Sequence, residues 1–422
     1  MKKILSGVSV IILFFLACNA VAQNSGKIKY VFLFIGDGMG LNQVFVTEKY
    51  NELTGIEPLI FMNHNWAFGL SRTECADSNK ITDSGAGGTA IACGKRVPFG
   101  GIGDFKGTPV ESIAEYLHSK NNFKIGIITS VPLNHATPAC FYGHESTRKN
   151  YDNLTKELIS SGFEFFAGGG FDVGNADSTK IIYKNFNMVL DDLRANDFHL
   201  VLNETQMNSM RPKESSRILI VDTAIRNKQL LLKNVYPDER NSLPCILDVP
   251  EQKMTLAKYT GLAETALMND QGFFIMVEGG KIDWACHDND ALTAIFEINA
   301  FNEAIRKAYE FYLKYPQNTL IIVTADHETG GMAQGTYMSG KSSKKNGGYE
   351  LYIKKLLQQK NSYIYSAKDS LAKTQRDARI GWTTFEHTSA PVGIWAIGNG
   401  SEVFSGIMKN EEIKEKILEL IK

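Results

Sequence analysis

The chain has 422 residues, of which 43% are hydrophobic and 22% are charged, and its formal net charge is −1 at pH 7. This is the composition of a globular protein with enough apolar side chains for a large core, and it argues against a disordered or fibrous chain. The balanced charge gives no basic surplus of the kind that suits nucleic acid, so we expect no nucleic acid recognition.

The first 22 residues have the pattern of a secretion signal. A basic start at Lys2-Lys3 precedes an apolar run over residues 8–17 and a small-x-small cleavage site at residues 20–22. The apolar run is short for a membrane span, so a membrane anchor is the less favoured interpretation. A lipoprotein attached through Cys18 is a second alternative, with a poor sequence context before the cysteine. We expect residues 1–22 to be removed and the mature chain to be periplasmic or secreted, without a transmembrane span.

Removal of this signal would leave five cysteines, Cys75, Cys93, Cys140, Cys245 and Cys286. Their spacing has no zinc-knuckle pattern. In an oxidising compartment an odd number allows at most two internal disulfides, and the sequence does not indicate which cysteines would pair.

Apolar runs alternate with helical patterns along the whole chain. The continuous apolar run over 29–35, which ends in Gly36-Asp37-Gly38, predicts a central parallel strand buried on both faces. Helices and strands are expected in the following order: helix 41–52, helix 112–119, strand 124–129, helix 151–160, strand 163–167, helix 188–195, strands 198–202 and 217–221, helix 252–268, strand 273–277, helix 291–313, strands 319–324 and 392–397, and helix 411–421. This alternation predicts an α/β fold, a doubly wound and mostly parallel sheet with helices on both faces.

We expect a single catalytic domain over residues 23–422. One segment, 339–360, is rich in Lys, Ser and Gly and has no clear strand pattern. We interpret residues 339–380 as an inserted surface module. Its lysines favour a solvated charged face, and attraction of an anionic substrate is the alternative.

Polar side chains gather where predicted strands end. Asp37, the segment 129–137, Glu278 and Asp326 each follow the carboxyl end of an expected strand. Ligand sites in open α/β sheets lie at this edge, so we expect these four segments to converge there.

A serine between an acidic residue and a run of small residues is the first candidate for chemistry. Ser84 follows Asp83 and precedes the small-residue run 85–90. If that run opens a helix, Ser84 lies at the positive end of the helix dipole, where an anion is favoured. The alternative is that Asp83 or Ser84 only caps the helix.

Several carboxylates and histidines have the spacing of metal ligands. Asp283 and His287 are four residues apart and would share one helix face, and a carboxylate with an imidazole suits zinc. The alternative for this pair is a capped helix with a surface ion pair. A buried Glu278 would need a cation or a hydrogen-bond donor. The remaining candidates are Asp37, Asp326, His327 and His387, each of which could alone be a turn residue.

Together these residues are enough for two zinc positions and a third, oxygen-rich position. The hydroxyl of Thr137 suits Mg²⁺ when combined with carboxylates. Arg148 offers a planar fork that matches phosphate oxygens, although a surface ion pair is its alternative role.

The chain resembles the alkaline phosphatases, the secreted metal-dependent phosphomonoesterases. The resemblance covers nearly the whole mature chain and is specific because the motifs occur together and in the family's order. The motifs are Gly36-Asp37-Gly38, Thr82-Asp83-Ser84, His135-Ala136-Thr137-Pro138 through Arg148, Glu278 through Asp283 and His287, Asp326-His327 with Glu328-Thr329-Gly330, and His387-Thr388.

This resemblance implies a serine nucleophile, two Zn²⁺ and one Mg²⁺. Ser84 would attack phosphorus, Arg148 would clamp two phosphate oxygens, and Asp83 would orient Arg148. The implied metal ligands are Asp283, His287 and His387 for the first zinc, Asp37, Asp326, His327 and the Ser84 oxygen for the second zinc, and Asp37, Thr137 and Glu278 for magnesium.

Three departures from the family pattern affect these expectations. His135 stands where well-studied enterobacterial members have Asp, so Zn²⁺ or Co²⁺ could compete for the third position. Trp284 stands where others have Lys or His near the phosphate, so a cationic contact with phosphate is missing there. We expect both His135 and Trp284 to line the substrate-binding part of the site. Gly85, Gly87 and Gly88 replace alanines, although each Gly costs a helix about 1 kcal/mol.

The implied function is hydrolysis of small-molecule phosphate monoesters through a phosphoserine, by an enzyme that could be a homodimer. One alternative is a phosphodiesterase or sulfatase of the same superfamily. The other is a non-catalytic exported protein that binds metal or phosphate, which would not need the Ser84 nucleophile.

Overall fold

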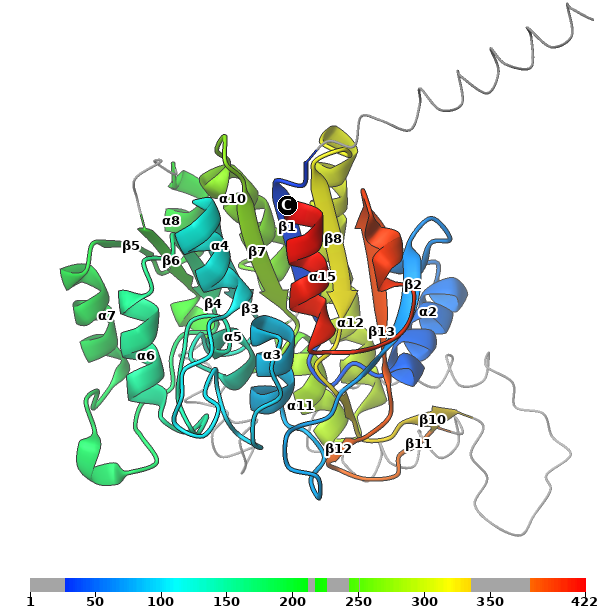
Figure 1. Cartoon of the computed structure of the whole chain (residues 1–422), viewed down its shortest axis with the longest axis horizontal. Coiled ribbons are helices and arrows are strands. Elements are labelled where there is room, and N and C mark those ends of the chain that lie inside the picture. The colour runs from blue at the N-terminus through cyan, green and yellow to red at the C-terminus, as the bar shows by residue number, and fades with distance from the viewer. Residues whose placement is uncertain (1–26, 212–216, 226–242, 250, 335–379) are drawn as a thin grey trace, which may run out of the picture.

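A ten-stranded sheet runs through the middle of the molecule, in the order β14-β2-β13-β8-β1-β7-β3-β4-β6-β5 (Figure 1). The computed structural model describes residues 27–211, 217–225, 243–249, 251–334 and 380–422. The strands of this sheet are β1 (Tyr30–Ile35), β2 (Ala67–Arg72), β3 (Lys124–Thr129), β4 (Phe165–Gly168), β5 (Phe198–Val201), β6 (Arg217–Val221), β7 (Phe273–Glu278), β8 (Thr319–Thr324), β13 (Val392–Gly398) and β14 (Gly406–Lys409).

Two short antiparallel pairs complete the strands. They are β9 (Glu328–Thr329) with β12 (His387–Thr388), and β10 (Ala333–Gln334) with β11 (Ile380–Gly381). The first pair joins two segments far apart in the chain.

Strand β1 is buried on both faces, as its apolar run predicts. Val31, Leu33 and Ile35 pack into the core on one side of the sheet, and Phe32 and Phe34 pack into the core on the other. Successive side chains of a strand point to opposite faces, so a strand covered on both sides needs apolar residues at every position.

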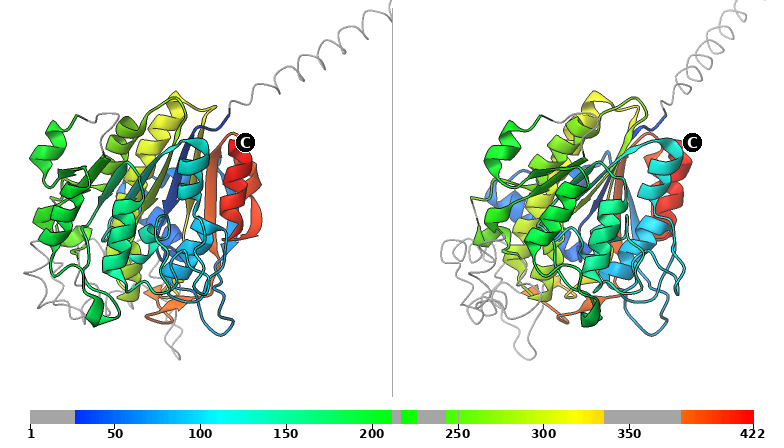
Figure 2. Two further views of the ribbon diagram at one scale, coloured as in Figure 1. Left: turned by 60° about the vertical axis from the view of Figure 1, so that its left-hand side comes forward. Right: turned by 90° about the vertical axis from the view of Figure 1, so that its left-hand side faces the viewer.

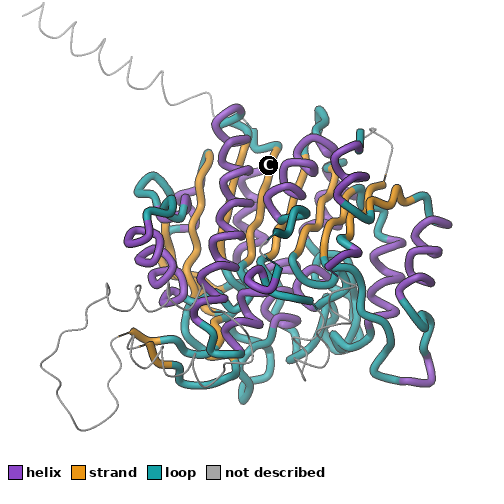
Figure 3. Tube along the Cα trace, turned by 180° about the vertical axis from the view of Figure 1, so that it is seen from behind, coloured by secondary structure: helices purple, strands orange, loops and turns teal. Residues whose placement is uncertain are grey.

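Helices lie on both faces of the sheet (Figure 2), and Figure 3 shows the molecule from the side opposite to that of Figure 1. The helices that pack on the face of Val31 are α3 (Ser84–Cys93), α4 (Ile113–Asn121), α6 (Tyr151–Ser160), α7 (Phe186–Ala195) and α15 (Glu412–Ile421). The opposite face is covered by α2 (Leu41–Thr54), α8 (Glu204–Ser209), α10 (Leu256–Leu267) and α12 (Ala291–Lys314). The shorter elements are α5 (Ala136–Ala139), α11 (Lys281–His287), η1 (Ile60–Met62), η2 (Ser178–Lys180), η4 (Ile246–Asp248) and η6 (Ser401–Phe404).

The doubly wound, mostly parallel α/β fold is confirmed. The strands at 124–129, 217–221 and 319–324 and the helix at 151–160 have the expected bounds, and the other expected elements are present with ends shifted by a few residues. In the sheet, β13 runs antiparallel to both of its neighbours, β8 and β2. Its apolar run predicts a buried strand, but burial alone does not indicate direction.

Strands β2 and β14 were not expected from the sequence. In β2, Phe68 and Arg72 are exposed and Gly69 interrupts the pattern, and Ile407 of the four-residue β14 is exposed. Strands near a sheet edge are covered on one face only, so they lack the continuous apolar run of a central strand.

Some expectations fall outside the described residues. These are the signal at 1–22 and all but the last residue of the module at 339–380. The five cysteines of the expected mature chain are all free thiols. Among the described residues, no helix combines the length and hydropathy needed to cross a bilayer.

The core prediction concerns Phe301 of α12. Its side chain is fully buried, and its ring lies 5.8 Å from that of Phe34 on β1. Replacement by alanine leaves a cavity between helix and sheet, so Phe301→Ala should lower the free energy of unfolding by about 3–5 kcal/mol. Urea unfolding followed by circular dichroism measures this. Leu313→Ala on the same helix is the control, since Leu313 is 61% exposed and its loss should cost less than about 0.5 kcal/mol. Equal losses would contradict the assignment of the core.

Candidate active site

The polar residues expected at the sheet edge do converge there. Strands β8, β1, β7 and β3 are consecutive neighbours, and their carboxyl ends lie at the lower edge in Figure 1, near α3, α11 and β12. Glu278, the last residue of β7, is in register with Ile35 of β1 and Thr129 of β3. Asp37 and Asp326 follow β1 and β8 directly.

Ser84 is the first residue of helix α3, as the dipole argument requires. Its Oγ lies 3.3 Å from Nε2 of His327 and accepts from Nη1 of Arg148 at 3.4 Å. The positive end of a ten-residue helix and a guanidinium therefore meet at one hydroxyl.

Asp83 both caps α3 and forms an ion pair with Arg148, so capping is not its only contact. One carboxylate oxygen accepts from the backbone of Ala86 at 3.1 Å and of Gly100 at 2.8 Å. The other is 3.1 Å from Nη1 of Arg148. Burial alone would raise the pKa of Asp83, but Arg148 and the two N–H groups outweigh burial and hold it below its usual value. The carboxylate is thus a permanent anchor for the guanidinium.

The glycines of α3 have a steric reason that the sequence did not reveal. A Cβ at Gly87 would lie 2.7 Å from the backbone oxygen of Asp326, and one at Gly88 would lie 3.0 Å from Sγ of Cys140. At Gly85 it would lie 3.2 Å from the backbone oxygen of Gly101. The helix therefore packs closer to the segment after β8 than an alanine at position 87 would permit.

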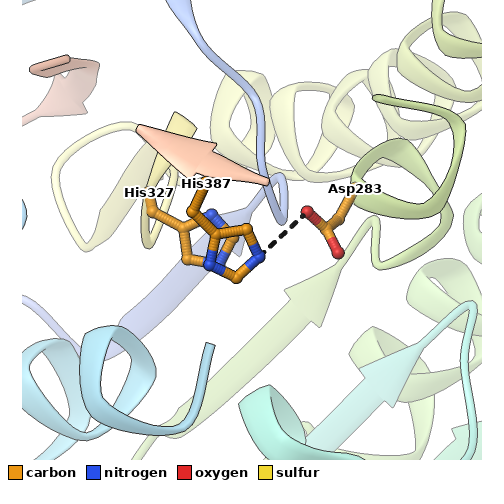
Figure 4. Close-up of side chains that lie close together, drawn as sticks. All are labelled: Asp283, His327 and His387. Carbon is orange, nitrogen blue, oxygen red and sulfur yellow. Dashed lines mark ion pairs between the residues drawn. The ribbon is translucent and has the colours of Figure 1, made fainter. Parts of the chain in front are cut away.

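The residues expected at the first zinc position lie together. Nε2 of His287 is 3.3 Å from Asp283 Oδ2 and 3.1 Å from His387 Nε2, and His387 Nε2 is 3.7 Å from Asp283 Oδ1. Figure 4 shows Asp283 and His387 facing each other, with the ring of His327 stacked on that of His387. Burial raises the pKa of Asp283, but the neighbouring imidazoles more than offset it and hold it below its usual range.

The second position is formed by His327, Asp37 and Asp326, all fully buried. His327 Nε2 lies 3.4 Å from Asp37 Oδ1 and 3.5 Å from Asp326 Oδ2. Burial raises the pKa of Asp37 and of Asp326 well above the usual value, and the other carboxylates of the site add to both shifts. Two buried carboxyl groups so close together need a positive charge between them.

The third position brings His135 next to Asp37 and Glu278. The Thr137 hydroxyl donates to Asp37 Oδ2 at 3.4 Å, and Thr129 donates to Glu278 Oε2. Burial raises the pKa of Glu278 to about 7. His135 thus lies among possible metal ligands as well as on the substrate side.

His135 also contacts Arg148. Its Nε2 is 3.0 Å from Nη2 of Arg148. Because a guanidinium can only donate, Nε2 is the acceptor and the ring is neutral. Burial, with Arg148 next in effect, lowers the pKa of His135 to about 3. The Nε2 lone pair used for Arg148 is then not available to a cation in this arrangement.

Trp284 packs beside His135, with ring centroids 6.1 Å apart at 84°. It is buried together with Val131, Ile225 and Leu243. Its contact with His135 places it beside the third position, and its role toward substrate stays a prediction.

The donor groups of this site suit divalent cations. Buried oxygens of Asp37 (Oδ1), Asp326 (Oδ2) and Glu278 (Oε1) have no hydrogen-bond partner among the described residues. Nδ1 of His287 faces the carbonyl of Phe385, and Nδ1 of His387 faces that of Thr82, so Nδ1 carries a proton in both rings. When these rings are neutral, Nε2 is the nitrogen that could bind a metal. The donor groups therefore fit zinc and magnesium ions.

Two contacts to these ligands were missed by sequence reasoning. Thr129 binds Glu278, and Thr329 binds Asp283. A threonine at the end of a buried strand, level with a candidate ligand on the next strand, is the only sequence signal for the first contact. For the second there is none beyond proximity to Asp326-His327.

A family model described as alkaline phosphatase matches residues 28–167 and 187–422. The chain belongs to the alkaline phosphatase family. Alkaline phosphatase 4 of Bacillus subtilis (strain 168) is 28% identical over 453 aligned residues, which cover 96% of this chain and 91% of that protein.

Solved alkaline phosphatases have the same fold. That of the Antarctic bacterium TAB5 is 29% identical, with a TM-score of 0.67 over 94% of this chain and 98% of its own. A variant of the TAB5 enzyme with one histidine replaced by aspartate has Mg bound in its M3 site; it is 30% identical, with a TM-score of 0.66 over the same shares of the two chains.

Family membership makes this chain a hydrolase and supports hydrolysis of phosphate monoesters. The alkaline phosphatases are metal-dependent, in agreement with the grouped donors described above.

Close packing of α3 leads to a testable expectation at Gly87. The Cβ of Gly87→Ala would push α3 away from Asp326 and shift Ser84 relative to His327. Misplacement of a reacting group by a fraction of an ångström should lower kcat for a phosphate monoester by about tenfold to a hundredfold. Gly261→Ala on α10 is the control, because a Cβ there meets no atom within 4 Å and should leave kcat unchanged. A Gly87→Ala enzyme with normal kcat would show that the close approach is not needed.

Proposed function

We propose that this chain hydrolyses small-molecule phosphate monoesters through a phosphoserine formed on Ser84. The observation that carries the proposal is the position of the Ser84 hydroxyl, at the helix N-terminus and within reach of both His327 and Arg148. A hydroxyl that faces anion-binding groups on one side and metal-binding groups on the other suits attack on a phosphoryl group.

We propose two Zn²⁺ and one Mg²⁺ as cofactors. The first zinc would be held by Asp283, His287 and His387, the second by Asp37, Asp326, His327 and Ser84, and magnesium by Asp37, Thr137 and Glu278, with His135 making Zn²⁺ or Co²⁺ possible there. When bound, these ions would lower the pKa of oxygen nucleophiles and neutralise charge on the phosphoryl oxygens.

The protein groups then have separate tasks in two displacement steps. Arg148, anchored by Asp83, binds two phosphoryl oxygens and aligns phosphorus with Ser84. In the first step Ser84 loses its proton, the Oγ–P bond forms, the bond from phosphorus to the alcohol oxygen breaks, and the leaving alcohol gains one proton, so that no net proton is released. In the second step water breaks the Oγ–P bond, which restores the serine hydroxyl and releases inorganic phosphate.

The same residues favour a monoester over a diester. A monoester dianion has three terminal oxygens and two negative charges, which is one oxygen and one charge more than a diester has. Two of these oxygens would bind the guanidinium fork of Arg148, and the third would face the third position around Glu278. Trp284 occupies a place where a cation could have contacted phosphate, so binding of phosphate relies mainly on Arg148. A purely binding protein could use the anchored guanidinium of Arg148, but it would not need the Ser84 nucleophile.

We further propose that residues 1–22 direct export and that the enzyme acts in the periplasm or outside the cell. The basic start and small-x-small site of that segment support this. A homodimer remains our expectation from the family resemblance.

The proposed reaction is tested by turnover of a chromogenic phosphate monoester and its matching diester. Purified residues 23–422 with zinc and magnesium should hydrolyse the monoester faster, and chelation should abolish turnover. Ser84→Ala should lower kcat by at least about a thousandfold and prevent acid-stable labelling by radioactive phosphate, because no phosphoserine can form.

Ser405→Ala is the control for this substitution, since Ser405 lies between η6 and β14, the strand at one edge of the sheet. Faster turnover of the diester would replace our proposal with a diesterase. An unchanged Ser84→Ala enzyme would exclude the phosphoserine.

The third position can be tested at His135. The carboxylate of His135→Asp is a harder ligand than imidazole and adds a negative charge beside Asp37 and Glu278, so the Mg²⁺ concentration for half-maximal activation should fall by about tenfold. The Mg-bound TAB5 variant with the same type of substitution supports this expectation. His135→Asn, which adds no charge, should not produce the shift. Equal behaviour of both variants would argue against a charge effect at this position.

A further inference from the structure

We propose that the Thr329 hydroxyl is a positioning group that holds ligands of both zinc positions at once. It would orient Asp283 of the first position and set the tautomer of His327 in the second. This inference rests on the metal assignment in the proposed function.

Thr329 lies on β9, two residues after His327, and is fully buried. Its Oγ1 donates to Oδ1 of Asp283 at 2.5 Å and lies 3.2 Å from Nδ1 of His327. The hydroxyl therefore bridges a residue from α11 and a residue from the segment after β8.

The number of protons on each group determines which atom donates in the contacts of Thr329 with Asp283 and His327. An ionised carboxylate only accepts, and a hydroxyl has one proton, so the proton of Thr329 lies toward Asp283. Its lone pairs can then only accept, which requires the proton of the neutral His327 ring to sit on Nδ1. Nε2 of His327 is left with a lone pair, directed toward Ser84, Asp37 and Asp326.

His327 differs in this respect from the two other histidines of the site. His287 and His387 have their tautomers set by backbone carbonyls, those of Phe385 and Thr82. Thr329 is a side chain, so at His327 alone the acceptor is removed by a single substitution. Hydrogen bonds of this kind to ligating histidines fix ring orientation and tautomer.

The surrounding backbone holds Thr329 in place. Its N–H donates to the carbonyl of Gly38 at 3.2 Å, and it pairs with His387 across β9 and β12. A Cβ at Gly38 would lie 2.8 Å from Thr329 Oγ1 and 2.7 Å from Asp283 Oδ1, so glycine leaves the space that this contact occupies.

Glu328, the residue before Thr329, adds side-chain contacts to the pair of strands β9 and β12. Glu328, also buried, accepts from Gln43 Nε2 at 2.7 Å and from the Thr388 hydroxyl. Thr388 follows His387, so β9 is tied to the first zinc position by backbone and side chain. A movement of Thr329 away from Asp283 would therefore also break its backbone pairing with His387 on β12.

The test is the zinc affinity of Thr329→Val, which keeps the shape of the side chain and removes the hydroxyl. Metal-free full-length mature protein is titrated with zinc in competition with a chromophoric chelator. We expect the dissociation constants of both zinc ions to rise by about 10–100-fold, the range for loss of a group that orients metal ligands. Co²⁺-substituted protein should show an altered visible absorption spectrum, because the ligand arrangement changes.

Two variants serve as matched controls. Thr329→Ser retains the hydroxyl and should bind zinc within about threefold of the unaltered chain. Thr260→Val removes a buried hydroxyl on α10, which donates to the carbonyl of Leu256, and should leave zinc affinity unchanged. Circular dichroism of the metal-free variants checks that each is folded.

The outcomes separate this inference from the proposed function. If the unaltered chain binds two zinc ions and Thr329→Val binds them equally well, or Thr329→Ser is as weak as Thr329→Val, the positioning role is wrong and the proposed function stands. If the folded, unaltered chain binds no zinc, the metal assignment fails and this inference fails with it.

Discussion

The structure depends on four acidic side chains that are buried close together. Asp37, Glu278, Asp283 and Asp326 are buried at the carboxyl edge of neighbouring strands. The fold brings them there because parallel strands end at one edge. Burial, with repulsion between the carboxylates next, raises the pKa of Asp37, Glu278 and Asp326. Bound divalent cations would offset the cost of ionising these groups, so the arrangement suits such ions.

The approach of α3 to this edge is the second constraint. A helix of ten residues with three glycines is intrinsically weak, yet all of its residues are buried. The loss of helix propensity is offset by packing, since only glycine allows the backbone of Asp326 so near. Asp83 then joins three tasks in one carboxylate: it caps the helix, holds the loop at Gly100 and anchors Arg148. Ser84 and Arg148, the proposed nucleophile and phosphate-binding residue, are therefore positioned relative to each other by one side chain.

Much of this could be predicted from the sequence, for a physical reason. Apolar runs such as that of β1 identify central strands, and residues that follow them must share an edge; hence Asp37, Glu278 and Asp326 were grouped correctly. The direction of β13, the role of Gly87 and the contact of His135 with Arg148 could not be predicted. Each depends on the distance between segments remote in the chain, which residue types and spacing do not specify. The contact of Thr329 with Asp283 could not be predicted either, because the motif around Thr329 does not indicate which side chain of α11 its hydroxyl faces.

The pairing of β9 with β12 has a consequence for chains whose synthesis stops early. The ligands extend from Asp37 to His387, and the last of them reaches its place only when β12 adds to β9. A polypeptide cut short before that point would retain most of its sheet and its serine while lacking one wall of the metal centre. Under the proposed zinc assignment, only chains that extend through His387 would complete the metal centre, so metal binding would select for molecules synthesised past β12.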